Sequence, residues 1–595
     1  MTTFKTTRRG ALAGATALSA AACAGSPSRE AFTVKVPDAN NVFAHGVASG
    51  DPAADSVVIW TRASVSALGG VPVVWEVAED REFKNVAKSG SFETSAARDY
   101  TVKVVVEGLE AGATYYYRFR AASAVSPTGR TRTLPEGSIE QVKFAVMSCS
   151  NYPFGYFNAY DHIARQDDLN AVIHLGDYIY EYGPDGYGGE IGEELGRAHN
   201  PPKEIITLED YRLRHAQYKS DHGSQAMHAA HPMIAMWDDH ETANNTWADG
   251  AQNHNPGRGE GPWRDRLAAA MQAYYEWMPV RDPRPGKTRE DLYRAFEFGD
   301  LLTLATIETR LTARSLQLEY KDIVPTLKTP EDIANFRKNV LGAEDRMMIG
   351  AAQERYLADT LSTSVEAGKP WRVIGNQIIM ANVHAADLSP YITKEMMDEI
   401  AKDWDGIYDF VEFSKLGLPL NLDAWDGYPA ARERFYAMSK NAGASDLLVV
   451  TGDTHTWWAN DLSANSGDRM GIELGTSAIS SPGAGSFLGD RSEDLARLIN
   501  RDNASVRYYS GEMRGYIALT LDAEGRGSAD FVAMSTVESP EYEAYVLASF
   551  GFKKKDGTIE FDRIRHVGMK DEALFKYDFV NDGGPGFFGK IGLML

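Results

Sequence analysis

Four apolar stretches of strand length end in side chains that bind metals, and this repeated plan constrains the fold more than any other feature. They lie at residues 144–150, 171–177, 233–241 and 447–455. An apolar run bounded by glycine or polar residues is typical of a buried strand. In open α/β sheets, ligands bind at the carboxyl ends of such strands. The plan therefore predicts a layered core of the α/β or α+β class with a ligand site at one edge of its sheet.

The polar residues at these strand ends form a mixed set of metal ligands. Carboxylate oxygens suit hard cations such as Ca²⁺ or Mn²⁺, whereas a thiolate and a phenolate suit a more strongly acidic transition metal such as iron. One of the carboxylates, Asp177, offers two oxygens and can bridge two metals. The set comprises Cys149, Asp177, Tyr180, Asp239, His240, Asp453 and His455.

A cluster of cations at these positions would bind a phosphate group. The metals neutralise phosphoryl oxygens and lower the pKa of a bound water, which gives hydroxide near neutral pH. No Gly-x-Ser-x-Gly elbow lies near a plausible strand–helix turn, and no P-loop is present, so serine-hydrolase and NTPase functions find little support.

Each candidate also has a structural interpretation that the sequence leaves open. Asp177 follows a glycine and suits an Asx turn, and the pair Asp239-His240 suits a surface salt bridge. Cys149 has no partner cysteine once a leader is removed, and a buried thiol is the common fate of free cysteine. Asn376, in a predicted strand at residues 371–377, suits a turn and a substrate-binding role equally well. Other histidines in helical or loop contexts are expected to be ordinary polar residues; they include His215, His222, His228 and His231.

The N-terminal residues 1–30 predict an export signal. Arg8-Arg9 precedes a small, apolar stretch at residues 11–22 that is too short to span a bilayer. A twin arginine before such a stretch is typical of a Tat signal, so we expect a partnership with the Tat machinery and a periplasmic or secreted location, without a transmembrane segment. Cys23 directly follows an Ala-rich cleavage site and offers a lipid anchor as an alternative, although the usual Leu three residues earlier is absent.

With 595 residues, the chain is longer than one hydrophobic core usually supports, and its pattern divides it. Residues 38–135 predict an all-β domain, whose Gly-containing corner at residues 109–120 resembles that of a fibronectin type III-like sandwich. Residues 140–595 predict a catalytic domain with a C-terminal tail. Within it we expect helices at residues 263–278 and 347–361, a loop near the site at 182–199, and an edge hairpin formed by 515–521 and 529–534.

The formal net charge of -22 argues against stable binding to nucleic acid or to an anionic membrane, because both would repel the protein. A solvated acidic surface accounts for most of such an excess. A carboxylate-rich metal site would contribute to it.

The ordered set of motifs resembles the alkaline phosphatase D (PhoD) family. The similarity runs from about residue 40 to the C-terminus. It is carried by residues 44–52, 58–62, 148–150, 174–181, 237–241, 426–429 and 450–455. This resemblance implies a fibronectin type III-like sandwich before a calcineurin-like metallophosphoesterase core of layered sheets. It also implies an exported phosphatase/phosphodiesterase with one Fe³⁺ and two Ca²⁺.

Carried over by position, the resemblance also implies roles for individual residues. Cys149, Asp177 and Tyr180 match iron ligands, and Asp177 also bridges to calcium. Three more residues match further metal ligands: Asp239, Asp453 and His455. His240 matches the histidine of a Gly-Asn-His-Glu motif, which contacts substrate or protonates the leaving group. Here Asp239 stands in place of the asparagine of that motif.

We therefore expect an enzyme that hydrolyses phosphate mono- and diesters with a metal-bound hydroxide held near Asp177. One alternative is a phosphodiesterase specific for a polymer such as teichoic acid or nucleic acid. Another is a non-catalytic envelope binding protein, in which the sandwich is the working module and the core is a metal-stabilised scaffold.

Overall fold

The computed structural model describes residues 42–65, 69–187, 189, 191–401, 407–483 and 492–566. The predicted export signal, Cys23 and the Gly-rich segment at residues 583–586 lie outside these ranges. No helix within the described ranges has the length and apolarity needed to cross a membrane.

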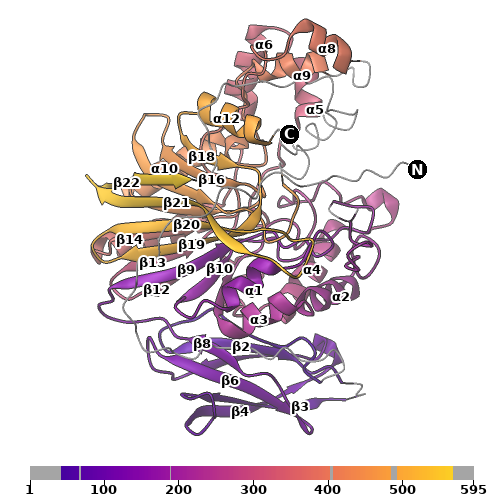
Figure 1. Cartoon of the computed structure of the whole chain (residues 1–595), viewed down its shortest axis with the longest axis vertical. Helices are drawn as coiled ribbons and strands as arrows, with labels where there is room; N and C mark the ends of the chain where they lie inside the picture. Colours follow the sequence, from indigo (N-terminus) through magenta and orange to yellow (C-terminus); the bar gives the residue numbers. More distant parts are fainter. Residues whose placement is uncertain are drawn as a thin grey trace.

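Two large β-sheets packed face to face form the centre of the molecule (Figure 1). The first has ten strands in the order β22-β21-β20-β19-β9-β10-β11-β1-β2-β5. Its strands are β1 (Val47–Gly50), β2 (Ser56–Arg62), β5 (Thr101–Glu107), β9 (Gln141–Met147), β10 (Ala171–His174), β11 (Pro232–Ala235), β19 (Arg514–Asp522), β20 (Arg526–Met534), β21 (Ala544–Lys555) and β22 (Thr558–His566).

The second sheet has seven strands in the order β12-β13-β14-β15-β17-β16-β18. Within it, β13, β14, β15 and β17 run parallel to one another. Its strands are β12 (Arg294–Phe298), β13 (Leu302–Thr306), β14 (Trp371–Gly375), β15 (Leu447–Thr451), β16 (Trp457–Ser463), β17 (Arg469–Gly475) and β18 (Val506–Ser510).

The central strands are apolar throughout because both of their faces are covered. In β9, Phe144 and Val146 pack into the core between the two sheets, whereas Ala145 and Met147 pack against helices on the outer face. Successive side chains of a strand point to opposite faces, so a strand buried on both sides lacks polar alternation. This burial explains the continuous apolar runs of the sequence.

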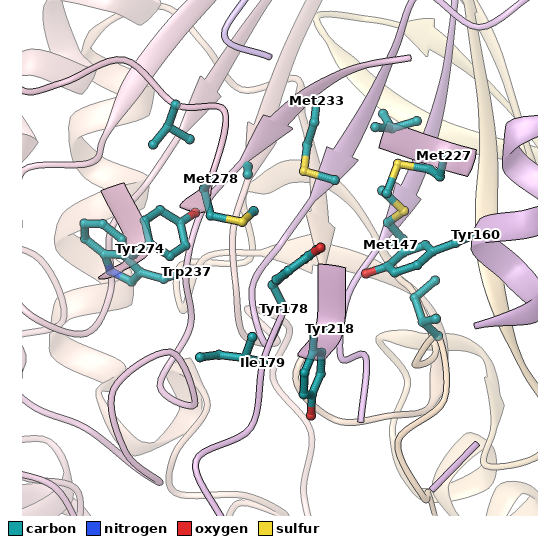
Figure 2. Close-up of a cluster of buried hydrophobic side chains, with 14 of the residues drawn as sticks. Met147, Tyr160, Tyr178, Ile179, Tyr218, Met227, Met233, Trp237, Tyr274 and Met278 are labelled. Atoms are coloured by element: carbon teal, nitrogen blue, oxygen red, sulfur yellow. The ribbon is translucent and has the colours of Figure 1, made fainter. Parts of the chain in front are cut away.

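Helices cover the outer face of each sheet. The cluster over the ten-stranded sheet, shown in Figure 2, joins Met147 and Met233 from the strands to aromatic side chains such as Tyr160, Tyr218 and Tyr274 from the helices. The helices there are α1 (Asn158–Ala164), α2 (Leu208–Lys219), α3 (His222–Ala230) and α4 (Trp263–Trp277). Those over the seven-stranded sheet are α7 (Ala351–Glu366), α10 (Pro429–Asn441) and α12 (Ser492–Asp502).

The N-terminal region is rich in β-structure, as predicted. A five-stranded sheet packs against β1, β2 and β5 around a core that includes Ile59, Val73 and Phe119. It contains β3 (Val71–Ala78), β4 (Val86–Thr94), β6 (Thr114–Ala121), β7 (Ala124–Val125) and β8 (Gly129–Arg132). Parallel pairing of β1 with β11, through Ser49 and Gly50, makes one face of this region continuous with the ten-stranded sheet.

Four short helices gather at the end of the molecule opposite to β3, β4 and β6 (Figure 1). They are α5 (Tyr320–Ile323), α6 (Pro330–Asn335), α8 (Lys394–Ile400) and α9 (Ile407–Ser414). They belong to insertions that follow β13 and β14. The Tyr320 hydroxyl donates to the Pro419 carbonyl, and its ring lies 4.7 Å from that of Phe413, so the two insertions are joined.

The structure confirms most of the predicted elements and corrects one. Strand β14 and helix α4 match their predicted ranges closely, and α7 begins at Ala351, after Gly350, rather than at residue 347. The hairpin predicted at the sheet edge is wrong in its placement. Strand β19 pairs with β9, and β20 pairs with β21, so both strands are internal.

The edge is formed instead by residues after Glu538, which we predicted to be a C-terminal tail. Strands β21 and β22 continue the sheet, and Phe550 and Phe552 of β21 are buried in the core between the sheets. Asp556-Gly557 connects them as a hairpin turn, and both residues have positive φ. The alternation of Ala548, Phe550 and Phe552 was the signal that could have shown this strand.

Several buried histidines predict a loss of stability in mild acid. Burial is the largest cause that lowers the pKa of His45, His174, His215 and His231 to about 3, from the ordinary 6.5. As pH falls below 6.5, these histidines become protonated in the unfolded chain but stay neutral in the folded chain. The free energy of unfolding should therefore fall. His215→Phe removes one such group. It should reduce the dependence of the free energy of unfolding on pH by up to about 1.4 kcal/mol per pH unit between pH 6 and 5, as measured by urea titrations at each pH.

The exposed His222 provides the matched control, since His222→Gln should leave the slope unchanged. Equal slopes for His215→Phe and the wild-type protein would contradict the prediction.

Candidate metal centre

The loops after four strands bring the predicted ligands together at the carboxyl edge of the two sheets. Strands β9, β10 and β11 are parallel neighbours in one sheet, and β15 belongs to the other. The Cys149 Sγ lies 3.3 Å from Asp177 Oδ2, and the Tyr180 hydroxyl lies 3.0 Å from His455 Nε2. The site is therefore assembled across the seam between the sheets.

Four of the predicted ligands have a backbone conformation that is rare outside glycine. The φ angles are 62° at Cys149, 55° at Asp177, 64° at Asp453 and 55° at His455. Positive φ in such residues is uncommon, and strained backbone of this kind clusters at functional sites. The extended backbone of each strand therefore ends at these residues, and their side chains point towards one another.

The glycine before Asp177 is required by its surroundings. Gly176 has a φ of 114°, and a Cβ atom at this position would lie 2.4 Å from the Asp238 backbone nitrogen. Only glycine allows the loops after β10 and β11 to approach this closely.

The buried carboxylate of Glu241 holds these two loops. It accepts hydrogen bonds from the backbone nitrogens of Asp177 (3.1 Å), Tyr178 (2.5 Å) and Asp238 (2.8 Å). Burial raises the pKa of Glu241 to about 8. Glu241 ends the motif at residues 237–241, but the sequence predicted no role for this residue.

The first group of candidate ligands surrounds Asp177. Its Oδ2 accepts from Cys149 and from the Tyr180 hydroxyl at 3.2 Å, whereas Oδ1 is buried without a hydrogen-bond partner. Burial and the neighbouring carboxylates hold the pKa of Asp177 well above its usual range, and burial and Asp177 do the same for the Cys149 thiol. A nearby cation would reverse both shifts, because it favours the ionised forms.

The second group surrounds a guanidinium that the sequence analysis did not identify. Arg310 is fully buried and forms a two-point ion pair with Asp238, with 3.1 Å between Nη2 and Oδ2. The same nitrogen lies 3.3 Å from Asp453 Oδ1 and 3.5 Å from Asp239 Oδ1, and Nη1 lies 2.8 Å from Asp423 Oδ2. One arginine thus contacts four carboxylates.

The acids around Arg310 titrate differently because their surroundings differ. Burial raises the pKa of Asp238 to about 6, although Arg310 opposes the shift. At Asp239, burial acts in the same direction, but His240, Arg310 and the backbone N–H of Asn245 outweigh it and lower the pKa to about 2. Burial raises the pKa of Asp453 well above its usual range. The cluster carries more acid than Arg310 can neutralise.

His240 lies beside this cluster and is oriented by Glu181. Its Nδ1 is 2.7 Å from Glu181 Oε2, and its Nε2 is 4.0 Å from Asp239 Oδ2. Burial opposes the charged imidazolium, but Asp239, Glu181 and Asp177 outweigh this effect and raise the pKa of His240 well above its usual value. His240 is therefore predicted to be protonated near neutral pH in the absence of metal.

Seven of the predicted site residues lie together, and the eighth does not share their contacts. The side chain of Asn376 is buried, donates to the Ile378 carbonyl at 2.7 Å, and lies 3.4 Å from the Trp425 indole nitrogen. These contacts fit the turn interpretation. The substrate-binding role of Asn376 stays a prediction.

The loop at residues 182–199 reaches the site, as expected. The Tyr187 hydroxyl lies 2.9 Å from His455 Nδ1 and donates to the Pro482 carbonyl. Its ring stacks on His455 with 5.8 Å between the centroids. Tyr187 was not identified from the sequence, because a tyrosine in a Gly-rich loop carries no signal of its partner.

The arrangement of these side chains fits bound metals. Three groups of potential ligands have ligand atoms within 4.8 Å of one another: Cys149, Asp177 and His455; Asp177, Asp239 and His240; and Asp238, Asp239 and Asp453. Buried Oδ1 atoms of Asp177 and Asp239 lack hydrogen-bond partners, and buried polar atoms without partners are rare in native proteins. Thiol, imidazole and carboxylate donors together match a transition metal beside a harder cation.

Removal of Arg310 should expose the electrostatic role of this residue. In chelator-treated protein, Arg310→Met should lower the free energy of unfolding by about 3–5 kcal/mol at pH 7.5, because it leaves buried carboxylates without a counter-charge. This decrease in the free energy of unfolding should become smaller towards pH 5, because protonated carboxyl groups need no counter-charge. Urea titrations at both pH values measure the difference.

An exposed ion pair provides the control for this substitution. Arg165 is 69% exposed beside Asp161, so Arg165→Met should change stability by less than about 1 kcal/mol. An Arg310→Met protein as stable as the wild type at pH 7.5 would contradict the prediction.

Comparisons with known proteins match both parts of the chain. The family model described as PhoD-like phosphatase matches residues 144–530, and the model described as PhoD-like phosphatase, N-terminal domain, matches residues 28–135. Alkaline phosphatase D of Bacillus subtilis (strain 168) is 35% identical over 534 residues, which cover 86% of this chain and 81% of that protein.

A solved structure agrees with these sequence matches. The structure of PhoD superposes with a TM-score of 0.70 at 32% identity, and covers 89% of this chain and 93% of its own. The chain therefore belongs to the PhoD-like phosphatase family, and is a phosphoesterase.

Proposed function

We propose that this protein hydrolyses phosphate mono- and diesters in a metal-dependent reaction. The observation that carries this proposal is the convergence of one thiol, one phenol, two imidazoles and several carboxyl groups at the seam of the two sheets. Membership in the PhoD-like phosphatase family supports it. A buried acidic cluster repels a phosphate dianion unless cations offset it, so metal and substrate binding are coupled.

The proposed cofactors are one Fe³⁺ and two Ca²⁺. Cys149, Asp177 and Tyr180 would hold the iron, and Asp177 would also bridge to calcium. Further metal ligands would be Asp239, Asp453 and His455. When bound, these metals supply neutralisation of the phosphoryl oxygens and a water of lowered pKa. The mixed donor set and the unpartnered oxygens of Asp177 and Asp239 support this assignment.

Three residues of the chain have proposed roles around the substrate. His240 would protonate the oxygen of the leaving group through Nε2, the ring nitrogen that faces Asp239. Arg310 would keep the acidic groups ionised and spaced, since it contacts four of them. Asn376 would bind substrate, if its amide leaves the contacts with Ile378 and Trp425.

The remaining parts of the proposal concern architecture and location. We propose a fibronectin type III-like sandwich at residues 38–135, followed by a metallophosphoesterase-like catalytic domain at residues 140–595. Two facing sheets with helices outside support the second description. The twin arginine at residues 8–9 supports Tat export to the periplasm or beyond, with a lipid anchor at Cys23 as the alternative.

An ester panel tests the proposed activity. Metal-replete protein should hydrolyse both 4-nitrophenyl phosphate and bis(4-nitrophenyl) phosphate, and removal of metal by a chelator should reduce both rates to the buffer blank. Elemental analysis should find iron and calcium before chelation. Turnover of diesters alone would favour a polymer-specific phosphodiesterase. No turnover of any ester by metal-replete protein would favour an envelope binding protein.

The proposed iron ligands have a spectroscopic test. A phenolate on Fe³⁺ absorbs visible light, so the protein should be coloured and Tyr180→Phe should remove the colour. Tyr178→Phe is the matched control, because the Tyr178 hydroxyl contacts Ser224 and His228 rather than any proposed metal ligand, and it should keep the colour. Cys149→Ser should lower the iron content strongly and should change the midpoint of unfolding only slightly. A colourless, iron-free and fully active wild-type protein would refute the iron assignment.

A further inference from the structure

We propose that Glu181 is a positioning residue for catalysis, which directs Nε2 of His240 towards the leaving group of the substrate. This inference rests on the proposed function, and it assigns a role to a residue outside the ligand set. Glu181 follows Tyr180 directly in the chain. Its side chain, unlike that of Tyr180, points to His240 rather than to Asp177.

The surroundings of the Glu181 carboxylate favour a hydrogen bond that it accepts from His240. Its Oε1 accepts the backbone N–H of Asn244 at 2.6 Å and the side-chain amide of Asn253 at 2.7 Å. Its Oε2 lies 2.7 Å from His240 Nδ1. Glu181 is fully buried, and a carboxylate with these donors is an acceptor only, so Nδ1 carries the hydrogen of that bond.

The same contact decides which ring nitrogen is available for chemistry. With Nδ1 committed to Glu181, Nε2 faces Asp239 and the metal ligands. The ring cannot rotate freely, because the Tyr180 ring lies 4.3 Å from it and the Tyr182 ring 5.3 Å from it, measured between centroids. A hydrogen bond on one nitrogen sets the role of the other in this way in many histidine sites.

A buried arginine holds the backbone on both sides of Glu181. Nη1 of Arg214 donates to the carbonyl of Tyr180 and, at 3.0 Å, to that of Tyr182. Its other nitrogens donate to the carbonyls of Asn200, Pro201 and Lys203. Arg214 thus ties the segment of Glu181 to the following loop, and the carboxylate is pre-organised rather than placed by His240.

The proton transfer that Glu181 would support is balanced. Oxygen from water forms the new bond to phosphorus, and the bond from phosphorus to the leaving oxygen breaks. The electron pair of that bond stays on the leaving oxygen, which takes the proton from His240 Nε2. The attacking water releases one proton to solvent. Nδ1 keeps its hydrogen and its bond to Glu181, and His240 regains one proton from solvent before the next turnover.

A comparison of leaving groups tests this role. A 4-nitrophenyl ester needs little protonation of its leaving oxygen, whereas an ethyl ester needs it strongly. Glu181→Gln should therefore lower kcat for ethyl phosphate about 100-fold and that for 4-nitrophenyl phosphate less than about 5-fold, with KM unchanged. His240→Asn should show the same contrast. The double variant should be no slower than His240→Asn alone, because both residues act in one step.

Two further measurements separate positioning from structure. The iron and calcium contents of Glu181→Gln should equal those of the wild type. Glu473→Gln is the matched control: Glu473 is an equally buried carboxylate that accepts from Met380, Ala381 and Asn460, and its loss should not change the contrast between the two esters. If Glu181→Gln fails to fold, Asn253→Ala removes one donor to Glu181 at a half-buried position and should give a weaker contrast of the same sign.

The outcomes distinguish this proposal from the proposed function. Equal loss on both esters, or a double variant slower than His240→Asn, would overturn the role of Glu181 and leave the proposed function intact. A wild-type protein that hydrolyses neither these esters nor any other of the panel would overturn the proposed function and, with it, this role.

Discussion

The burial of several acidic side chains at the seam between two sheets is the constraint on which the site depends. An ionised carboxylate away from water is costly unless a cation or N–H donors compensate it. The chain meets this cost in three ways. Arg310 contacts four aspartates, Glu241 and Glu181 accept backbone N–H groups, and His240 pairs with Glu181. Oδ1 of Asp177 and Oδ1 of Asp239 accept no hydrogen bond, so both oxygens remain available to a cation.

The fold makes this arrangement rigid because the candidate ligands come from both sheets. Cys149, Asp177 and Asp239 follow strands of the ten-stranded sheet, and Asp453 follows a strand of the seven-stranded one. The core between the sheets holds their separation, through large side chains such as Trp371 and Phe144. Dense packing of this kind resists small shifts, so the distances between ligands are set by the core rather than by the loops alone.

Much of the framework was predictable from the sequence because it depends on local pattern. Continuous apolar runs located β9, β10, β11 and β15, and the polar residue after each run located the edge of the site. The prediction failed where the pattern was weaker. Strand β21 mixes exposed Tyr545 and Val546 with buried Phe550 and Phe552, so its period was missed and the hairpin before it was placed at the edge.

Sequence alone determined that several strands end in side chains able to bind a metal, and it identified these candidate residues, because both features are encoded within a few residues. Only the tertiary structure decided which charges meet. Arg310 lies 72 positions from Asp238 and 143 from Asp453, and nothing near Arg310 in the sequence marks it as their partner. Hydrophobic periodicity reports that a residue is buried, whereas the identity of its neighbour depends on how the two sheets pack.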